Sequence, residues 1–426
     1  MRSERCGVFV ALMLAVAAVV PAATRAAAPA IYNLGTLGGS ASQGYAINAS
    51  GQVTGVSYPT GSTVWHAFLY SGTPGSGGAM ANLGTLGGSS SYSFAINDGR
   101  QVVGYSDISG NTEYHAFIYG GTPGSGGSMA DLGTLGGAYS AAYAINAGGQ
   151  VAGWGLTTGS AQHAFLYSGT PGSGGHMIDL GTLGGSGSSA TAINSSGQLT
   201  GSSDVITGSI SYAFLYTGTP GAGGHMVGLG TLGGSHSYGT AINANGQVAG
   251  YSYRAGDLVT HAFLYSGTPG SGGAMADLGT LGGSTDHSYG YAIDSGGRVV
   301  GSSGTRDPLP AGGFASHAFL YSGTPSAGGQ MIDLDDWLDA NNPTEGAKWT
   351  LTDALALTDT GLITGVGDYN DGPGGLSDGR RAFLLDASAL VVPEPAGFVL
   401  LGIGVVGLLC WRAPRNRLAR ALPWRS

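Results

Sequence analysis

Cysteine is almost absent from this sequence. The chain has 426 residues but only two cysteines, Cys6 and Cys410, and both lie near its ends. The long central part can therefore hold no disulfide, no zinc site built on thiolates and no thiol nucleophile.

Basic residues are also scarce. Lys348 is the only lysine, and the segment from Ala28 to Pro393 contains seven basic and 22 acidic residues. Such an acidic surface without basic clusters excludes nucleic acid as an expected partner. The repeated GTPGSGG segments are followed by no Lys-Ser or Lys-Thr pair, so they are not phosphate-binding loops.

Helical periodicity is missing between Ala28 and Gly329, whereas glycine is abundant, with 83 residues. A strict repeat replaces the helical pattern. The phrase LGTLGG begins at Leu34 and returns every 48 or 49 residues, at Leu83, Leu132, Leu180, Leu229 and Leu278. Repeats of this length are typical of propellers and solenoids.

Each repeat predicts four short strands. In the second repeat these are residues 94–97, 101–106, 115–120 and 128–133, separated by turns rich in Gly, Pro and Asn. The phrase LGTLGGS forms the end of the fourth strand and the crossing to the next repeat, where glycine permits a tight path. The Phe and Ile that recur in HAF and AIN are expected in the core.

The two ends of the repeat region complement each other. The seventh repeat stops after a third strand at 381–385, whereas residues 30–35 resemble a fourth strand with no repeat before it. We therefore predict an all-β, seven-bladed β-propeller with four strands per blade, over residues 30–386, closed by the N-terminal strand. An open solenoid is the alternative, but it would not explain the divided repeat.

The repeats resemble the HAF-repeat family of extracellular bacterial proteins. The triplet His-Ala-Phe begins at His66, His115, His163, His261 and His317, and it becomes Tyr-Ala-Phe at Tyr212 and Arg-Ala-Phe at Arg381. The resemblance implies export and repetition but no activity. Because the histidine is replaced in two repeats and no second ligand recurs at convincing spacing, we expect a local hydrogen bond rather than a metal ring.

Only the departures from the repeat could carry a specific function. These are the lengthened loops at 302–316 and 367–379 and the acidic crossing at 335–349, which we expect on one face of adjacent blades. Either they merely cover the seam of the ring, or they bind a glycan or Ca²⁺. The candidate ligand-binding residues are Arg306, Asp335, Asp336, Trp337, Trp349 and Tyr369, and the candidate calcium ligands are Asp368, Asp371 and Asp378.

The two ends of the chain have the composition of targeting segments. Residues 1–27 have the basic start, apolar run and small-residue end of a signal peptide, although a membrane anchor is the alternative. After a linker at 387–395, the apolar run 396–411 predicts a transmembrane helix, and residues 412–426 a basic cytoplasmic tail. A buried helix is the alternative for that run.

This C-terminal arrangement closely resembles the PEP-CTERM sorting signal of exported Gram-negative proteins. The resemblance rests on Pro393-Glu394-Pro395, the apolar run and the arginines that follow. It implies processing by an exosortase at the cell envelope.

Together these features predict an exported, envelope-associated repeat protein without enzymatic activity and with no required cofactor. Its expected role is a surface or extracellular-matrix interaction module that binds an extracellular polysaccharide or a surface protein. The alternative is a polysaccharide-active enzyme that uses the irregular face of repeats 6 and 7, with two carboxylates as its reacting pair.

Overall fold

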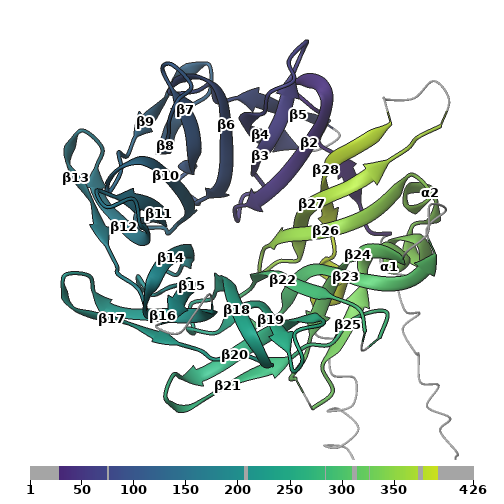
Figure 1. Ribbon diagram of the computed structural model, residues 1–426. Helices are drawn as coiled ribbons and strands as arrows, with labels where there is room; N and C mark the ends of the chain where they lie inside the picture. Colours follow the sequence, from purple (N-terminus) through teal and green to yellow (C-terminus); the bar gives the residue numbers. More distant parts are fainter. Residues whose placement is uncertain are drawn as a thin grey trace, which may run out of the picture.

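Seven four-stranded sheets surround a central axis in the computed structural model (Figure 1). The structure describes residues 28–391, except 74–75, 206–209, 284, 309–313, 326 and 373–377. Every sheet is antiparallel, and the predicted seven-bladed propeller is confirmed. Each described blade except blade 7 consists of four strands that follow one another in the chain. The first of these strands lies nearest the axis and the fourth lies at the periphery.

The strands have the following bounds. Blades 1 to 3 contain β2 (Gly38–Ile47), β3 (Val53–Pro59), β4 (His66–Thr73), β5 (Ser76–Asn82), β6 (Gly87–Ile96), β7 (Val102–Ile108), β8 (Tyr114–Thr122), β9 (Ser125–Asp131), β10 (Gly136–Ile145), β11 (Val151–Thr157), β12 (Gln162–Thr170) and β13 (Ser173–Asp179). Blades 4 to 6 contain β14 (Gly184–Ile193), β15 (Leu199–Val205), β16 (Ser211–Thr219), β17 (Ala222–Gly228), β18 (Gly233–Ile242), β19 (Val248–Arg254), β20 (Thr260–Thr268), β21 (Ser271–Asp277), β22 (Ser288–Ile293), β23 (Val299–Pro308), β24 (Phe314–Ser322) and β25 (Gln330–Asp333). Blade 7 contains β26 (Trp349–Leu357), β27 (Leu362–Tyr369), β28 (Gly379–Asp386) and β1 (Ile31–Asn33).

The first strand of the chain closes the ring. β1 pairs with β28 so that Ile31 faces Leu385 and Asn33 faces Phe383, and the purple β1 lies beside the yellow-green β28 in Figure 1. The predicted closure by the N-terminal strand is therefore confirmed, and an open solenoid is excluded.

The LGTLGG phrase is shared between a crossing and a strand. The first glycine of each phrase, such as Gly84, has φ between 71° and 79°, a region that favours glycine. In five of the six phrases the inner strand then begins at the fifth residue, for example at Gly87 in β6. The phrase was predicted to form the end of the outer strand and the crossing, with the inner strand of the second repeat only at 94–97. This boundary was wrong because the extended glycines already pair with the following strand, as Gly87 does with Ile108.

The hydrophobic core lies between neighbouring blades. The phenylalanine of every HAF or related triplet is fully buried, and these residues are Phe68, Phe117, Phe165, Phe214, Phe263, Phe319 and Phe383. Phe165, for example, packs against Val103 and Leu132 of the preceding blade. Each blade therefore stabilises the next, which explains why the phrase must recur with the same geometry.

Among the described residues, three short helices lie near the end of the repeat region. They are α1 (Leu334–Asn341), α2 (Pro343–Gly346) and α3 (Ser388–Val391). The first two replace the tight crossing before blade 7, where Asp335 stands in place of the glycine with positive φ. We predicted an acidic crossing here but no helix.

Candidate functional site

The HAF histidines are held by a partner on the neighbouring strand of the same blade. In four blades Nδ1 lies 2.7–2.8 Å from an aspartate oxygen; the pairs are His115–Asp131, His163–Asp179, His261–Asp277 and His317–Asp333. His66 contacts the equivalent Asn82 at 3.2 Å. The expected local hydrogen bond is confirmed, but the expectation that no second acidic residue recurs was wrong. The partner lies 16 residues along the chain, beyond a glycine-rich hairpin.

The same aspartate also shapes the crossing to the next blade. Its second oxygen accepts the backbone N–H of the glycine two residues later, as Asp131 does from Gly133 at 2.7 Å. In the fourth blade, Tyr212 replaces the histidine and Gly228 replaces the aspartate, so both partners change together. In the seventh, Arg381 donates instead to the Ser40 carbonyl of blade 1. The repeated histidines are therefore structural.

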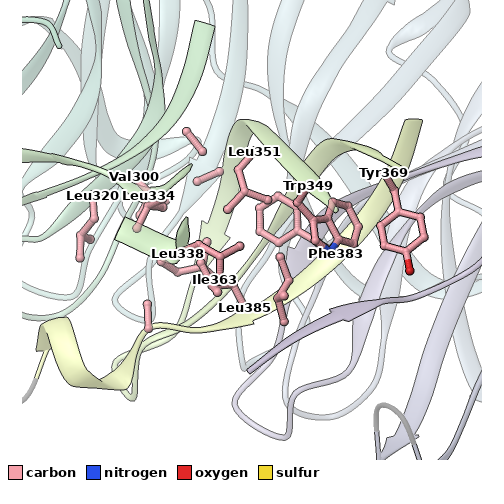
Figure 2. Close-up of a cluster of buried hydrophobic side chains, with 14 residues drawn as sticks. Val300, Leu320, Leu334, Leu338, Trp349, Leu351, Ile363, Tyr369, Phe383 and Leu385 are labelled. Atoms are coloured by element: carbon pink, nitrogen blue, oxygen red, sulfur yellow. The ribbon is translucent and has the colours of Figure 1, made fainter. Parts of the chain in front are cut away.

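The irregular crossing before blade 7, residues 334–348, packs its helix α1 between blades 6 and 7, and we call this segment the wedge. Asp333 caps α1 by accepting the N–H groups of Asp335 and Asp336, and Leu334 and Leu338 of α1 are fully buried. Figure 2 shows these leucines in one cluster with residues of both blades. An acidic first turn suits the positive end of the helix dipole. The wedge supports the prediction that this segment seals the ring.

The aromatic candidates at this wedge are mostly enclosed. Trp349 and Tyr369 are only 6% and 8% exposed, and their rings lie 4.8 Å apart beside Phe383 (Figure 2). Trp337 is partly buried against the same cluster. Trp349 and Tyr369 therefore present almost no ring face on which a sugar could stack.

Carboxylates gather around His317 at the start of α1. In the described part of the chain, His317, Asp333 and Asp336 form the only group of three His, Cys, Asp or Glu side chains with ligand atoms within 4.8 Å of one another. Asp335 lies 3.8 Å from His317 Nε2 and accepts the Leu351 N–H at 2.7 Å. Burial raises the pKa of Asp335 to about 6, despite the opposing hydrogen bond from Leu351.

The other candidate residues do not join this group. Arg306 lies against the glycine pair of its own crossing, with its guanidinium close to Gly283. Asp368 and Asp378 are exposed, whereas Asp371 lies near the Tyr369 hydroxyl. Among the described residues, Asp368, Asp371 and Asp378 form no cluster compact enough to hold one ion.

A ring of asparagines that we had assigned no role connects the blades around the axis. Each AIN asparagine donates its side-chain N–H to the equivalent backbone carbonyl of the next blade, with N···O distances of 3.0–3.3 Å. The series begins with Asn48 as donor and ends with Asp294 as acceptor. These residues surround an axial depression of about 390 Å³ lined by Ile47, Ile96, Ile145, Ile293 and Leu357, among others. Because the asparagines serve the ring itself, their repetition has a structural cause.

The end of the described chain is hydrogen-bonded to the face that carries the turns between the first and second strands of each blade. Arg298 donates to the carbonyls of Val391 and Asp359, and its guanidinium pairs with Asp294. This face is opposite the one that carries α1 and the long loops, since successive turns of an antiparallel sheet alternate between its two ends. The sorting residues Pro393, Glu394 and Pro395 lie outside the described residues, as do the predicted signal peptide and transmembrane helix. Within the described chain, no helix has the length and hydrophobicity needed to span a bilayer.

Comparison with known proteins identifies the C-terminal segment. The family model described as the PEP-CTERM protein-sorting motif matches residues 391–416. No curated protein matches the chain. The matched segment begins at Val391, where the chain leaves the propeller, and it marks an exported protein that is sorted by an exosortase at the cell envelope.

Proposed function

We propose that this chain is a non-enzymatic interaction module that an exosortase-dependent system places at the cell surface. The observation that carries the proposal is the match of the sorting motif at the exit from a complete, closed propeller. The signal peptide at 1–27 and the helix at 396–411 would take the chain through the inner membrane and hold it there until processing.

The position of the exit supports an interaction role. Val391 is held by Arg298 on the face that carries the turns between the first and second strands of each blade. The crossings and the loops between the second and third strands lie on the opposite face. A chain held at its C-terminus would therefore present the varied loops away from the membrane. The repeated histidines and asparagines already have structural partners, which leaves the differences between blades to recognise a polysaccharide or a surface protein.

The sorting part of the proposal is tested in a host that contains an exosortase. Replacing Pro393 and Pro395 with Ala should leave an uncleaved precursor in the membrane fraction, whereas Pro123→Ala with Pro171→Ala should be processed normally. Mass spectrometry of the mature wild-type protein should find no arginine-rich tail. An intact tail would mean that the helix is a permanent anchor, and a protein confined to the cytoplasm would refute the proposal.

A further inference from the structure

A groove between blades 3 and 4 interrupts the regularity of the ring. It has a volume of about 480 Å³ and lies on the face of the crossings and of the loops between the second and third strands. Residues 159–162 of blade 3 and residues 186–189, Ser202 and Asp204 of blade 4 line it. Ligand sites commonly have volumes of this order.

The groove exists because three aromatic side chains are missing. Between blades 2 and 3, Tyr114 packs against Tyr139 at 4.8 Å and against Trp154 at 6.2 Å. The equivalent positions between blades 3 and 4, by strand register, are Gln162, Gly187 and Ser202. Small residues thus stand where the preceding interface has three large rings.

The next two interfaces fill the same position with histidine. Between blades 4 and 5, His236 accepts the Ser211 N–H at 3.1 Å. Between blades 5 and 6, His287 accepts the Thr260 N–H at 3.1 Å. Gly187 occupies the position of His236 and His287 in the repeat, so the interface between blades 3 and 4 lacks the side chain that these two interfaces place there.

The missing side chain at Gly187 opens a path between two polar groups. A Cβ at this position would lie 3.2 Å from the Asp204 carboxylate and 3.5 Å from the Gln162 carbonyl. The Asp204 carboxylate is held in place by the Ser186 and Ser211 hydroxyls, at 3.0 and 2.7 Å. A bound molecule at the Gly187 position would therefore meet two acceptors, the fixed Asp204 carboxylate on one side and the Gln162 backbone carbonyl on the other.

The lining defines the chemistry of the ligand. The groove offers the hydroxyls of Ser160, Ser189 and Ser202 with one amide side chain and one carboxylate, whereas the Ser186 and Ser188 hydroxyls already donate to Asp204 and to the Gly181 carbonyl. No basic residue among those that the structure describes lines it. Hydroxyls both donate and accept hydrogen bonds, whereas a carboxylate only accepts. This combination suits a molecule rich in hydroxyl groups and disfavours an anion.

We infer that the groove between blades 3 and 4 binds a sugar unit of a neutral polysaccharide. Sugar hydroxyls donate to Asp204 and exchange hydrogen bonds with the surrounding serines and Gln162. The inference rests on the proposed function, since it names the ligand class and the site of the exported interaction module.

The groove can be closed with residues that the fold already accepts. Gly187→Tyr combined with Ser202→Trp introduces the residues found at the equivalent positions between blades 2 and 3. Ser173→Trp, at an exposed position on the opposite face of blade 3, is the matched control. Far-UV circular dichroism and melting curves establish that all variants are folded.

The probes are neutral tetrasaccharides of glucose, galactose and N-acetylglucosamine, titrated calorimetrically into the propeller domain with its complete closing strand. At least one should bind wild type, while a tetramer of galacturonic acid binds at least about tenfold more weakly because of repulsion by Asp204. The filled groove should lower affinity at least about tenfold, and Ser173→Trp should leave it unchanged. Asp204→Asn should weaken binding about tenfold, as expected for the loss of a hydrogen bond to a charged acceptor.

Two results would overturn the inference, and neither is the result that would overturn the proposed function. If no neutral tetrasaccharide binds wild type at about 10 mM, a level far above ordinary specific affinities, the ligand class is wrong. If one binds equally to the filled variant, the site is wrong. The proposed function fails instead if the wild-type protein remains in the cytoplasm, whatever the purified domain binds.

Discussion

If β1 closes the ring, a residue beside this strand should contribute as much to the free energy of unfolding as its equivalent in the middle of the chain. Leu34 and Leu83 are equivalent residues at the ends of outer strands. They are 4% and 5% exposed, and each donates its N–H to the alanine of the adjoining triplet, at 3.1 and 3.0 Å. Replacing either leucine with alanine should therefore lower the free energy of unfolding by a similar amount, about 2–5 kcal/mol.

The measurement is urea unfolding of the mature domain, followed by tryptophan fluorescence, which reports on Trp349 in the core between blades 6 and 7. The residues of a chain end normally tolerate change unless they are packed and hydrogen-bonded. If Leu34→Ala stays within about 0.5 kcal/mol of wild type while Leu83→Ala loses at least about 2 kcal/mol, β1 does not close the ring in solution.

Removal of the strand gives a second assay of the same closure. Deleting residues 30–35 exposes the edge of β28, and an unpaired edge promotes association with other chains. Size-exclusion chromatography should show oligomers, and a peptide spanning residues 28–37 should restore the monomer by pairing with β28. A truncated protein that is monomeric and as stable as wild type would refute the closed ring.

Two further predictions concern a core residue and a buried carboxyl group. Phe165→Ala should lower the free energy of unfolding by about 3–5 kcal/mol, whereas exposed Val64→Ala should change it by less than about 0.5 kcal/mol; equal urea midpoints would remove Phe165 from the core. The pKa of Asp335 rises from 3.8 in the unfolded chain to about 6 in the fold, so the folded state binds its proton more tightly and loses stability as pH increases through that range. Asp335→Asn should match wild type at pH 4 and exceed its unfolding free energy by up to about 3 kcal/mol at pH 8, because amide oxygen still accepts from Leu351; a variant no more stable at pH 8 would contradict this.

Local patterns account for most of what could be predicted about the fold. Short alternating apolar segments and turn residues predicted the strands, and the divided repeat predicted closure by β1. The helix α1 was missed although its signals were present. Asp333 precedes two acidic residues, and Leu334 and Leu338 are spaced one helical turn apart. A single short helix after six crossings that all begin with the same phrase was interpreted as a variant loop.

The geometry of the candidate site could be predicted less well from the sequence, because it depends on distances between residues of different strands. Loop composition made Trp349 and Tyr369 candidates for ligand binding, but both are almost completely buried in the cluster that also contains Leu334 and Leu338 of α1. The partner of His115 was missed because Asp131 lies across a hairpin, where sequence spacing does not indicate contact. Whether Asp368, Asp371 and Asp378 converge depends on loop paths that composition does not specify.

By itself, the sequence determined the number of repeats, the strands within each and the need for export, because these follow from local periodicity and from the composition of the chain ends. Only the tertiary structure decided which equivalent positions face each other across two blades. The groove beside Gly187 depends on Gln162, Gly187 and Ser202, which come from three different strands and have no joint pattern along the chain. At each of these three positions the interface between blades 2 and 3 has an aromatic ring, and the smaller residue leaves that space unfilled. Such a space exists only once the blades have packed together.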